Sequence, residues 1–441
     1  MKRHFLIVLS FILLGVETLA QVPPPVDPAA ARAAREQKKT PAVAVSLSRT
    51  ELELGYNRDF SHPDYLNRDL ISTAEMAPMS LLHIGLESVT GNSIPPIKLG
   101  ASLAAAIFDR AILHAGHEYG HLSAFSKAGY TDWRYDDGIN LTRQLDKDVS
   151  PSALFSDAFP SGDITVGVSE SEWNDIDRRF GRGRDYYEFS AAMEAGGLNQ
   201  SEATRVNYRD RLLEGRFGLY DTVPYFGGTF STLLYSSASG DLIDYVGALD
   251  AYGVHTSEGS VRLISLARFA SGSSWAALGS YVQSVAYGDS KDLFQPMTID
   301  AWSGRNWTAY YPEFESWLSR RGPTVKAMLP IRHTDGGWFF PSIEQSVAGG
   351  GMATEIGGYL KAPISSNSPL LAKLYAFANT EGGLWLEPGI GIKAADWLVL
   401  DLAGYWGNGY TFHRDIYGAT YDFVDKAESG VKAGFTVFIK F

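Results

Sequence analysis

The sequence predicts an α+β protein in which a mainly helical domain precedes an antiparallel, β-barrel-like C-terminal domain. A long stretch rich in helix-forming residues lies around residues 95–128, and helical periodicity continues to about residue 286. From Gly349 onward, glycine-punctuated runs of alternating apolar and polar residues replace that periodicity, which indicates strands. We therefore expect a helical domain at 57–330 and a β-barrel-like domain at 331–441.

Composition narrows the chemistry that this chain can perform. Hydrophobic residues make up 45% of the chain and aromatic residues 13%, enough for two domains with a sizeable core. The formal net charge of −12 argues against a nucleic-acid partner. The chain has no cysteine, which excludes disulfides, thiol catalysis and thiolate metal sites. Any metal ligands must therefore be His, Asp or Glu.

The first 20 residues have the pattern of a secretory signal peptide. Lys2 and Arg3 supply the positive charge, residues 5–16 form the apolar core, and Thr18-Leu19-Ala20 is a small-residue cleavage site. The apolar run is short for a membrane-spanning helix. We expect cleavage and export of the mature protein, with an uncleaved anchor as the alternative.

Two short segments connect this peptide to the helical domain. Residues 21–41 are rich in proline and alanine and are expected to form a linker. Residues 42–56 alternate between apolar and polar side chains, which predicts one or more strands. These strands are candidates to pair with the last strand of the chain and to close a barrel around the helical domain.

The pattern with the most specific chemistry is His-Glu-x-x-His at residues 117–121. Residues four apart lie one turn apart on the same helix face, so His117 and His121 can present two imidazole nitrogens to one ion. Zn²⁺ accepts such ligands, and a catalytic zinc keeps one position open for water. Glu118 can reach that water as a general base without binding the metal.

The flanking residues place this motif inside a long helix. Pro95-Pro96 fit a helix start and Gly129 fits a C-terminal cap. His114 lies on the same stripe but two turns from His121, so we assign it a supporting or substrate-facing role. His83, in an apolar segment at residues 76–86, is expected to be structural.

His117-Glu118-x-Gly120-His121 resembles the zinc metallopeptidases of the His-Glu-x-x-His class, and its glycine is similar to that of membrane-associated branches such as the site-two proteases. The resemblance covers about ten residues. It implies a zincin-like fold, Zn²⁺ as the cofactor, a protein or peptide substrate, His117 and His121 as ligands, and Glu118 as the catalytic base.

A zinc site needs a third ligand, which thermolysin-like (gluzincin) enzymes take from a glutamate on a later helix. The best candidate is Glu188, in a helix that we expect to run from Asp185 and to end at Gly196-Gly197. The chain departs from the family pattern in having Ala192 where an aspartate is expected. Glu194 is the runner-up. A site-two-like branch would instead use an aspartate, for which the candidates are Asp221, Asp244 and Asp250, with His255 as an outside possibility.

Further helices are expected up to about residue 286, and none has the uninterrupted apolar sequence of a membrane span. Residues 295–321 are expected to close the helical domain. Strands are then expected at residues 352–362, 370–379, 384–393, 397–406, 417–425 and 431–441. A turn at Ala394-Ala395-Asp396 joins two of them.

The last run alternates apolar and polar residues and ends on Phe441, which resembles the closing strand of bacterial outer-membrane β-barrels. These resemblances together imply an exported zinc metalloendopeptidase associated with the bacterial outer membrane. A competing hypothesis is a non-enzymatic outer-membrane barrel protein for transport, adhesion or assembly, in which the histidines are structural.

Overall fold

A computed structural model describes most of the chain after residue 50. The described residues are 51–61, 66–91, 93–136, 147–149, 165–181, 183–234, 240–287, 296–304, 306–347, 353–364, 368–417 and 427–440. All of them belong to one unit, Ser48–Phe441. The expected signal peptide, the linker and residues 42–50 lie outside the described residues.

Helices dominate the chain up to residue 287. They are α3 (Arg68–Thr90), α4 (Pro95–Lys127), α6 (Glu170–Phe180), α7 (Arg184–Leu213), α8 (Thr222–Leu234), α9 (Asp241–Ala251), α10 (Glu258–Ser265), η1 (Leu266–Ala270) and α11 (Gly272–Tyr287), with the short η2 (Asp300–Trp302) and α12 (Phe412–Tyr417) further on. A three-stranded sheet in the order β3-β2-β4 follows α4, with β2 at Trp133–Asp136, β3 at Lys147–Asp148 and β4 at Thr165–Val168.

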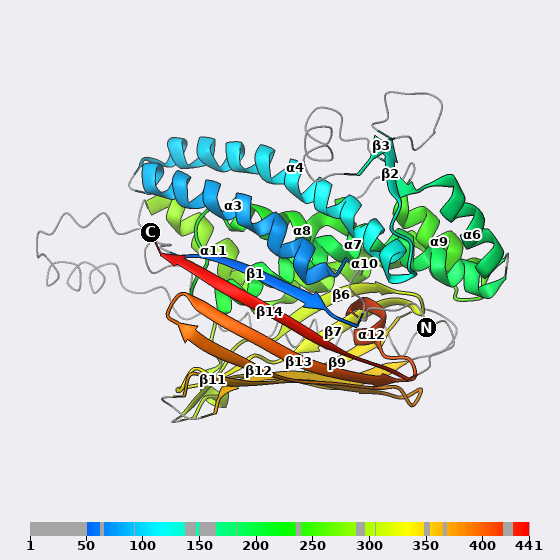
Figure 1. Ribbon diagram of the computed structural model, residues 1–441. Helices are drawn as coiled ribbons and strands as arrows, with labels where there is room; N and C mark the ends of the chain where they lie inside the picture. Colours follow the sequence, from blue (N-terminus) through cyan, green and yellow to red (C-terminus); the bar gives the residue numbers. More distant parts are fainter. Residues whose placement is uncertain are drawn as a thin grey trace, which may run out of the picture. The chain divides into compact units, whose positions relative to one another are not determined.

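The second half of the chain forms a large antiparallel sheet. Its strands are β1 (Glu51–Asp59), β5 (Trp307–Ala309), β6 (Glu313–Ser319), β7 (Gly322–Met328), β8 (Ile331–His333), β9 (Trp338–Ser346), β10 (Thr354–Pro363), β11 (Leu370–Asn379), β12 (Leu384–Ala395), β13 (Leu398–Asn408) and β14 (Glu428–Lys440). The order is β1-β14-β13-β12-β11-β10-β9-β7-β6, and β8 links β9 to β5. The long helices lie on one side of this sheet (Figure 1). The fold is therefore mixed α+β, as expected.

The first and last described strands pair with each other. In the β1–β14 ladder Leu52 lies opposite Ile439 and Tyr56 lies opposite Phe435. This is the long-range pairing that the alternation of residues 42–56 suggests, observed from residue 51 onward. About 370 residues, including all the long helices, thus separate two neighbouring strands of one sheet (Figure 1).

The sheet is not closed into a barrel, and the expectation of closure by strands alone is wrong. Its two ends are β1 and β6, and no ladder joins them within the described residues. Helix α3 packs against β1 and helix α7 packs against β6. The helices therefore occupy the opening that further strands would fill in a barrel.

The sheet also begins earlier than expected. Residues 295–321, expected to close the helical domain, contain β5 and β6, and β6 pairs with β7. All seven residues of β6 are buried, because the strand lies between β7 and helices η1 and α7. A strand buried on both faces loses the alternation that reveals a half-exposed strand.

The remaining strands agree well with expectation. β11 has the expected bounds, and β10, β12 and β13 each begin or end within a few residues of theirs. β7, β8 and β9 precede the first strand expected in this region, at residues 352–362, and are additions. Of the expected strand at 417–425, only Tyr417 is described, and it ends helix α12.

The helical layer packs around one main apolar cluster. Met76, Ile112, Tyr208 and Tyr225 bring α3, α4, α7 and α8 together there, and Ala277 adds α11. Within the described residues, no helix combines the length and apolar character needed to cross a membrane. The cluster fixes the relative positions of α4 and α7, the two helices on which the candidate site is built.

Candidate metal centre

The His-Glu-x-x-His motif lies in the C-terminal half of α4, as expected. Pro95-Pro96 begin this 33-residue helix, and the chain leaves it at Ala128 and Gly129, whose φ is 91°. His117, Glu118 and His121 are all buried. Helix α7 covers this part of α4. The motif is therefore held rigidly within the helical layer.

Glycines allow α4 and α7 to cross at very short range. A Cβ atom on Gly120 would lie 2.5 Å from the carbonyl oxygen of Gly196, and a Cβ atom on Gly197 would collide with the imidazole of His117. The expectation that Gly196-Gly197 end a helix is therefore wrong. Helix α7 runs through them from Arg184 to Leu213, because their role is close approach to α4.

The two motif histidines meet an aspartate from α9. His117 Nε2 lies 2.7 Å from Asp241 Oδ2, and His121 Nε2 lies 3.1 Å from the same oxygen. One ligand atom from each of these three residues lies within 4.8 Å of the others. Gly240, with a φ of 111° that favours glycine, immediately precedes Asp241 at the start of α9. This buried group could hold a metal ion.

The other nitrogen of His121 fixes its tautomer. Nδ1 donates a hydrogen bond to the carbonyl oxygen of Met193 on α7, at 2.7 Å. When the ring is neutral, this bond keeps the proton on Nδ1 and leaves the lone pair on Nε2, which faces Asp241. Such an arrangement is typical of a metal-binding histidine.

The charges around this group are strongly coupled. Burial disfavours the imidazolium of His121, but Asp241, with smaller effects from Glu118 and Glu194, raises its pKa to about 10. Burial likewise disfavours the carboxylate of Asp241, but His121 and His117 hold its pKa well below its usual range. In the metal-free protein the protonated ring of His121 therefore supplies the positive charge that a bound metal ion would supply beside Asp241.

Glu118 and His114 lie beside the metal-binding group. Glu118 is buried and close enough to act on the pKa of His121. Its Oε1 lies 4.0 Å from Nε2 of His114, one turn earlier on α4. Glu118 is therefore near the centre but outside the group of three, and His114 is its neighbour on the same helix.

Glu188, the expected third ligand, forms ion pairs with two arginines instead. Arg184 donates to its Oε1 at 2.7 Å, and Arg320 donates to its Oε2 at 3.2 Å. Both oxygens are therefore committed to arginines, and Glu188 is not in the group that can hold a metal. Asp241, instead of Glu188, is the carboxylate that joins His117 and His121.

The other candidates have distinct positions. Burial, opposed by His121, raises the pKa of Glu194 to about 8, so this carboxyl is near the centre without belonging to the group of three. Asp244 also acts on Glu194. Asp250 bonds His255 at 2.5 Å on the exposed end of α9. None of these three acidic residues, nor His255, joins His117 and His121.

Asp221 and His83 form a separate buried cluster. His83 Nδ1 lies 2.9 Å from Asp221 Oδ1, and His83 Nε2 lies 3.0 Å from Asp109 Oδ2. The two carboxylates bond opposite sides of the ring, so they cannot share one ion with it. This geometry supports the structural role expected for His83.

The residue that sequence reasoning misses is Asp241. Two of the aspartates proposed instead lie on the same helix, Asp244 in its first turn beside Asp241 and Asp250 near its end. The residue that joins the two histidines is nevertheless an aspartate, the residue type that the site-two-like alternative expects. A carboxylate in the first helical turn is favoured by the helix dipole, but this signal applies to Asp244 as well as to Asp241 and does not separate them.

The donor set fits a zinc-type centre. Two imidazoles and one carboxylate are a three-ligand set that Zn²⁺ accepts, and it leaves a fourth position for water or substrate. The side chains of His117 and Asp241 are 10% and 17% exposed, so the group is enclosed but reachable. Glu118 is a second carboxylate close to this group, and it could accept a proton from a water molecule bound there.

No protein-family model matches the chain, and neither a curated protein nor a solved structure shows significant similarity to it.

Proposed function

We propose that the protein is a zinc-dependent peptidase whose centre is held by His117, His121 and Asp241. The observation that carries this proposal is the convergence of an aspartate from α9 on the two histidines of a His-Glu-x-x-His helix. Zinc, when bound there, would polarise a peptide carbonyl and make water a stronger acid.

Residues of the protein itself would carry out the proton transfer and position the ligands. Glu118 accepts a proton from the attacking water and passes it to the leaving amine. Met193 orients His121 through its carbonyl group. The close crossing of α4 and α7 at their glycines fixes the position of His117 relative to α7. Such preorganisation of the ligands favours catalysis.

A peptide substrate is supported by the small sheet next to the site. Val166 of β4 packs with Ala115 and Tyr119 of α4, on the helix that carries the motif. β4 pairs with β2 on one side, and no ladder on its other side is seen among the described residues. An extended peptide can add to such a strand edge through main-chain hydrogen bonds. We place this activity in an exported protein of the bacterial outer membrane.

Replacing Glu118 with glutamine tests the proposed activity. The amide keeps the shape of the side chain but cannot accept a proton, so we expect zinc content to be unchanged and hydrolysis to fall by about 10²–10⁴-fold. Zinc content is measured by elemental analysis, and hydrolysis with a library of quenched fluorescent peptides. Glu188→Gln is the matched control and should retain both properties.

The competing non-enzymatic function predicts a different result. If Glu118→Gln cleaves as fast as the wild type, the hydrolysis does not depend on this centre and the proposed mechanism is wrong. If the wild-type protein binds zinc but cleaves no peptide in the library, the histidines hold a structural metal. The transport, adhesion or assembly role would then be the better account.

A further inference from the structure

The face of the large sheet that points away from the helices is apolar and exposed. Each of the strands β9–β14 contributes to it, and one such residue from each is Ile343, Leu360, Leu374, Ile390, Leu402 and Phe435. The ladders show that these residues share a face, since Leu360 lies opposite Leu374. Leu402 is 58% exposed. A sheet in water ordinarily buries its apolar face and exposes the other one.

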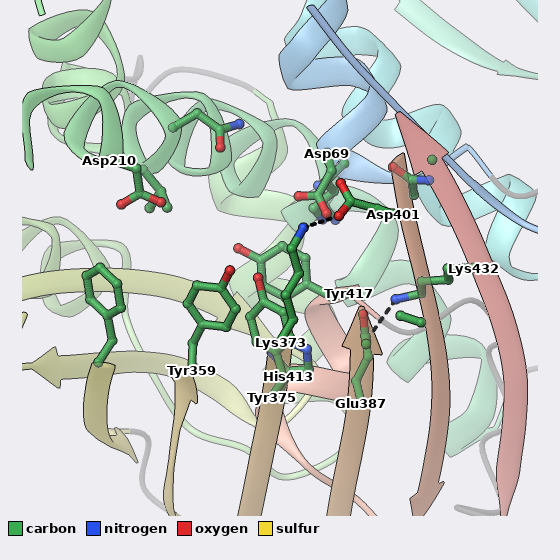
Figure 2. A pocket seen from close by; sticks show the side chains of 18 of the residues that line it. Asp69, Asp210, Tyr359, Lys373, Tyr375, Glu387, Asp401, His413, Tyr417 and Lys432 are labelled. Atoms are coloured by element: carbon green, nitrogen blue, oxygen red, sulfur yellow. Dashed lines mark hydrogen bonds and ion pairs between the residues drawn. The ribbon is translucent and has the colours of Figure 1, made fainter. Parts of the chain in front are cut away.

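The opposite face of the same strands is polar and charged. It lines a cavity of about 350 Å³ between the sheet and helices α3 and α7. Figure 2 shows Lys373 reaching Asp401 and Lys432 reaching Glu387 across this face. The polarity of the sheet is therefore inverted, with charges inside and aliphatic side chains outside.

Three helices present apolar side chains to the outside as well. The exposed ones include Leu81 and Val89 on α3, Leu103 and Ile107 on α4, and Leu278 and Val282 on α11. Two of them, α3 and α4, bury charged groups on the other side, such as Glu75 of α3 and Lys98 and Asp109 of α4, whereas α11 buries the hydroxyl groups of Ser280 and Ser284. All three helices thus expose apolar side chains and bury polar ones, as the sheet does.

The elements that carry these side chains form a closed ring of contacts. β14 pairs with β1, β1 packs on α3, α3 on α4, and α4 on α11. Helix α11 shares an apolar cluster with Met297, and the next residue, Thr298, pairs with Tyr310 beside β5. β5 pairs with β8 and β8 with β9, which returns to the sheet. The helices thus span the opening that the sheet leaves.

We propose that this ring is embedded in the hydrocarbon of a lipid bilayer, with the apolar outer faces of α3, α4 and α11 completing the lipid-facing wall. None of these helices is apolar enough on all sides to span a bilayer alone, because their other faces pack inside the protein. A partner protein would cover only one side of the ring, whereas the apolar surface extends around all of it. Lipid can cover such a surface on every side. Hydrocarbon also requires that no sheet edge be left open, and α3 covers the edge strand β1. The inference goes beyond the proposed activity and does not depend on it.

The dimensions of the ring agree with a bilayer. β9 has 9 residues and β14 has 13, while a tilted transmembrane strand needs about 9–11. The exposed Trp397 and Trp406 stand near the two ends of β13. At a rise of about 3.3 Å per residue they are about 30 Å apart along the strand. With the usual tilt this approaches the apolar height of about 25 Å in membrane barrels.

The metal centre then lies outside the hydrocarbon. His117 follows Ile107, the last exposed large apolar residue of α4, by ten residues, which is about 15 Å along the helix. Beyond that point α4 is covered by α7 and by β4. The proposed site therefore faces water at one surface of the membrane.

Single cysteines test the wall directly, because the chain has no cysteine of its own. Leu402→Cys and Ile390→Cys report on the sheet, Leu103→Cys and Leu278→Cys report on the helices, and Arg178→Cys on α6, where the arginine is 76% exposed, is the control. Each variant is reconstituted into phosphatidylethanolamine–phosphatidylglycerol vesicles and treated with a membrane-impermeant maleimide. We expect the four wall positions to react at least about tenfold more slowly than the control, because a thiolate does not form in hydrocarbon.

A second measurement shows whether lipid is what shields these positions from the maleimide. A fluorophore attached at each of the four wall positions should be quenched by nitroxide-labelled lipid, and the same fluorophore at residue 178 should not. Unchanged circular dichroism shows that each variant is folded. The pattern should be the same in Glu118→Gln and in metal-free protein, so failure of the proposed activity leaves this test intact.

Three outcomes would overturn the inference. Reaction of all four wall positions at the rate of the control would show that the ring is not in the bilayer. Protection of residues 390 and 402 but not of residues 103 and 278 would show that the helices are not part of the wall. Protection that appears only at high protein-to-lipid ratios would show that a second copy of the chain, instead of lipid, covers the surface.

Discussion

The imidazole of His121 is fixed at both nitrogens. Nδ1 donates to the Met193 carbonyl, and Nε2 faces the carboxylate of Asp241. With a pKa of about 10, the ring is a cation at neutral pH in the metal-free protein. This charge stabilises the metal-free fold below a pH of about 6.5, where both folded and unfolded states are protonated, and the contribution is lost as pH rises through 10.

Metal binding must displace that proton, which gives a measurable prediction. We expect zinc binding at pH 7.5 to release about one proton from His121, and the apparent affinity to rise with pH until the pKa near 10 is passed. Isothermal titration calorimetry in two buffers of different ionisation enthalpy measures the release. If zinc binding at pH 7.5 releases no proton, Nε2 of His121 does not bind the metal.

Single residues also show where sequence reasoning stops. His117, Glu118 and His121 could be predicted because one turn of one helix brings them together. Asp241 could not, since it reaches them only through the packing of α9 against α7. Glu188 occupies a plausible place on α7, but two arginines from α7 and the β6–β7 turn neutralise it there.

Among the elements, the crossing of α4 and α7 determines the geometry of the centre. The sequence suggests a helix end at Gly196-Gly197, because glycine terminates many helices. Only the partner helix shows that these glycines are needed for contact, since Gly120 and Gly196 approach each other through their backbones. A glycine used for close packing and one used as a cap look alike without this context.

Gly120→Ala tests the crossing. The new Cβ would lie 2.5 Å from the Gly196 carbonyl oxygen, so we expect a loss of about 1–3 kcal/mol in unfolding free energy together with weaker zinc binding. Gly100→Ala is the control on the same helix, because nothing lies within 4 Å of its Cβ position, and it should be neutral or stabilising. Denaturant unfolding and a zinc titration measure the two effects. Equal behaviour of the two variants would contradict the assigned role of the crossing.

For the whole molecule, the sequence predicts the mixed class and most strands, because half-exposed strands alternate. It does not predict β6, which is buried on both faces, nor the replacement of missing strands by helices. Both depend on contacts between distant parts of the chain. The β1–β14 pairing is an exception, since the two strands share the same alternation.

The charged interior gives a prediction at this scale. Lys432 Nζ donates to Glu387 Oε2 at 3.0 Å inside the cavity. Lys432→Met leaves a mostly buried carboxylate unpaired, so we expect a loss of roughly 3 kcal/mol in unfolding free energy, part of which Glu387→Gln should restore in the double variant. Guanidinium unfolding of the reconstituted protein measures this. Lys393→Met, which removes an exposed pair with Asp396, is the control and should change little. A Lys432 variant as stable as this control would show that the Lys432–Glu387 ion pair does not stabilise the fold.

The most direct test of the account is the zinc content of the purified protein after reconstitution, compared among wild type, Asp241→Asn and Glu188→Gln. These two variants make the same chemical change at the residue that the structure selects and at the residue that the sequence selects. We predict about one zinc per chain in the wild type and in Glu188→Gln, and loss of zinc in Asp241→Asn. Retention of zinc by Asp241→Asn, its loss in Glu188→Gln, or a wild type that binds none would contradict the assigned centre.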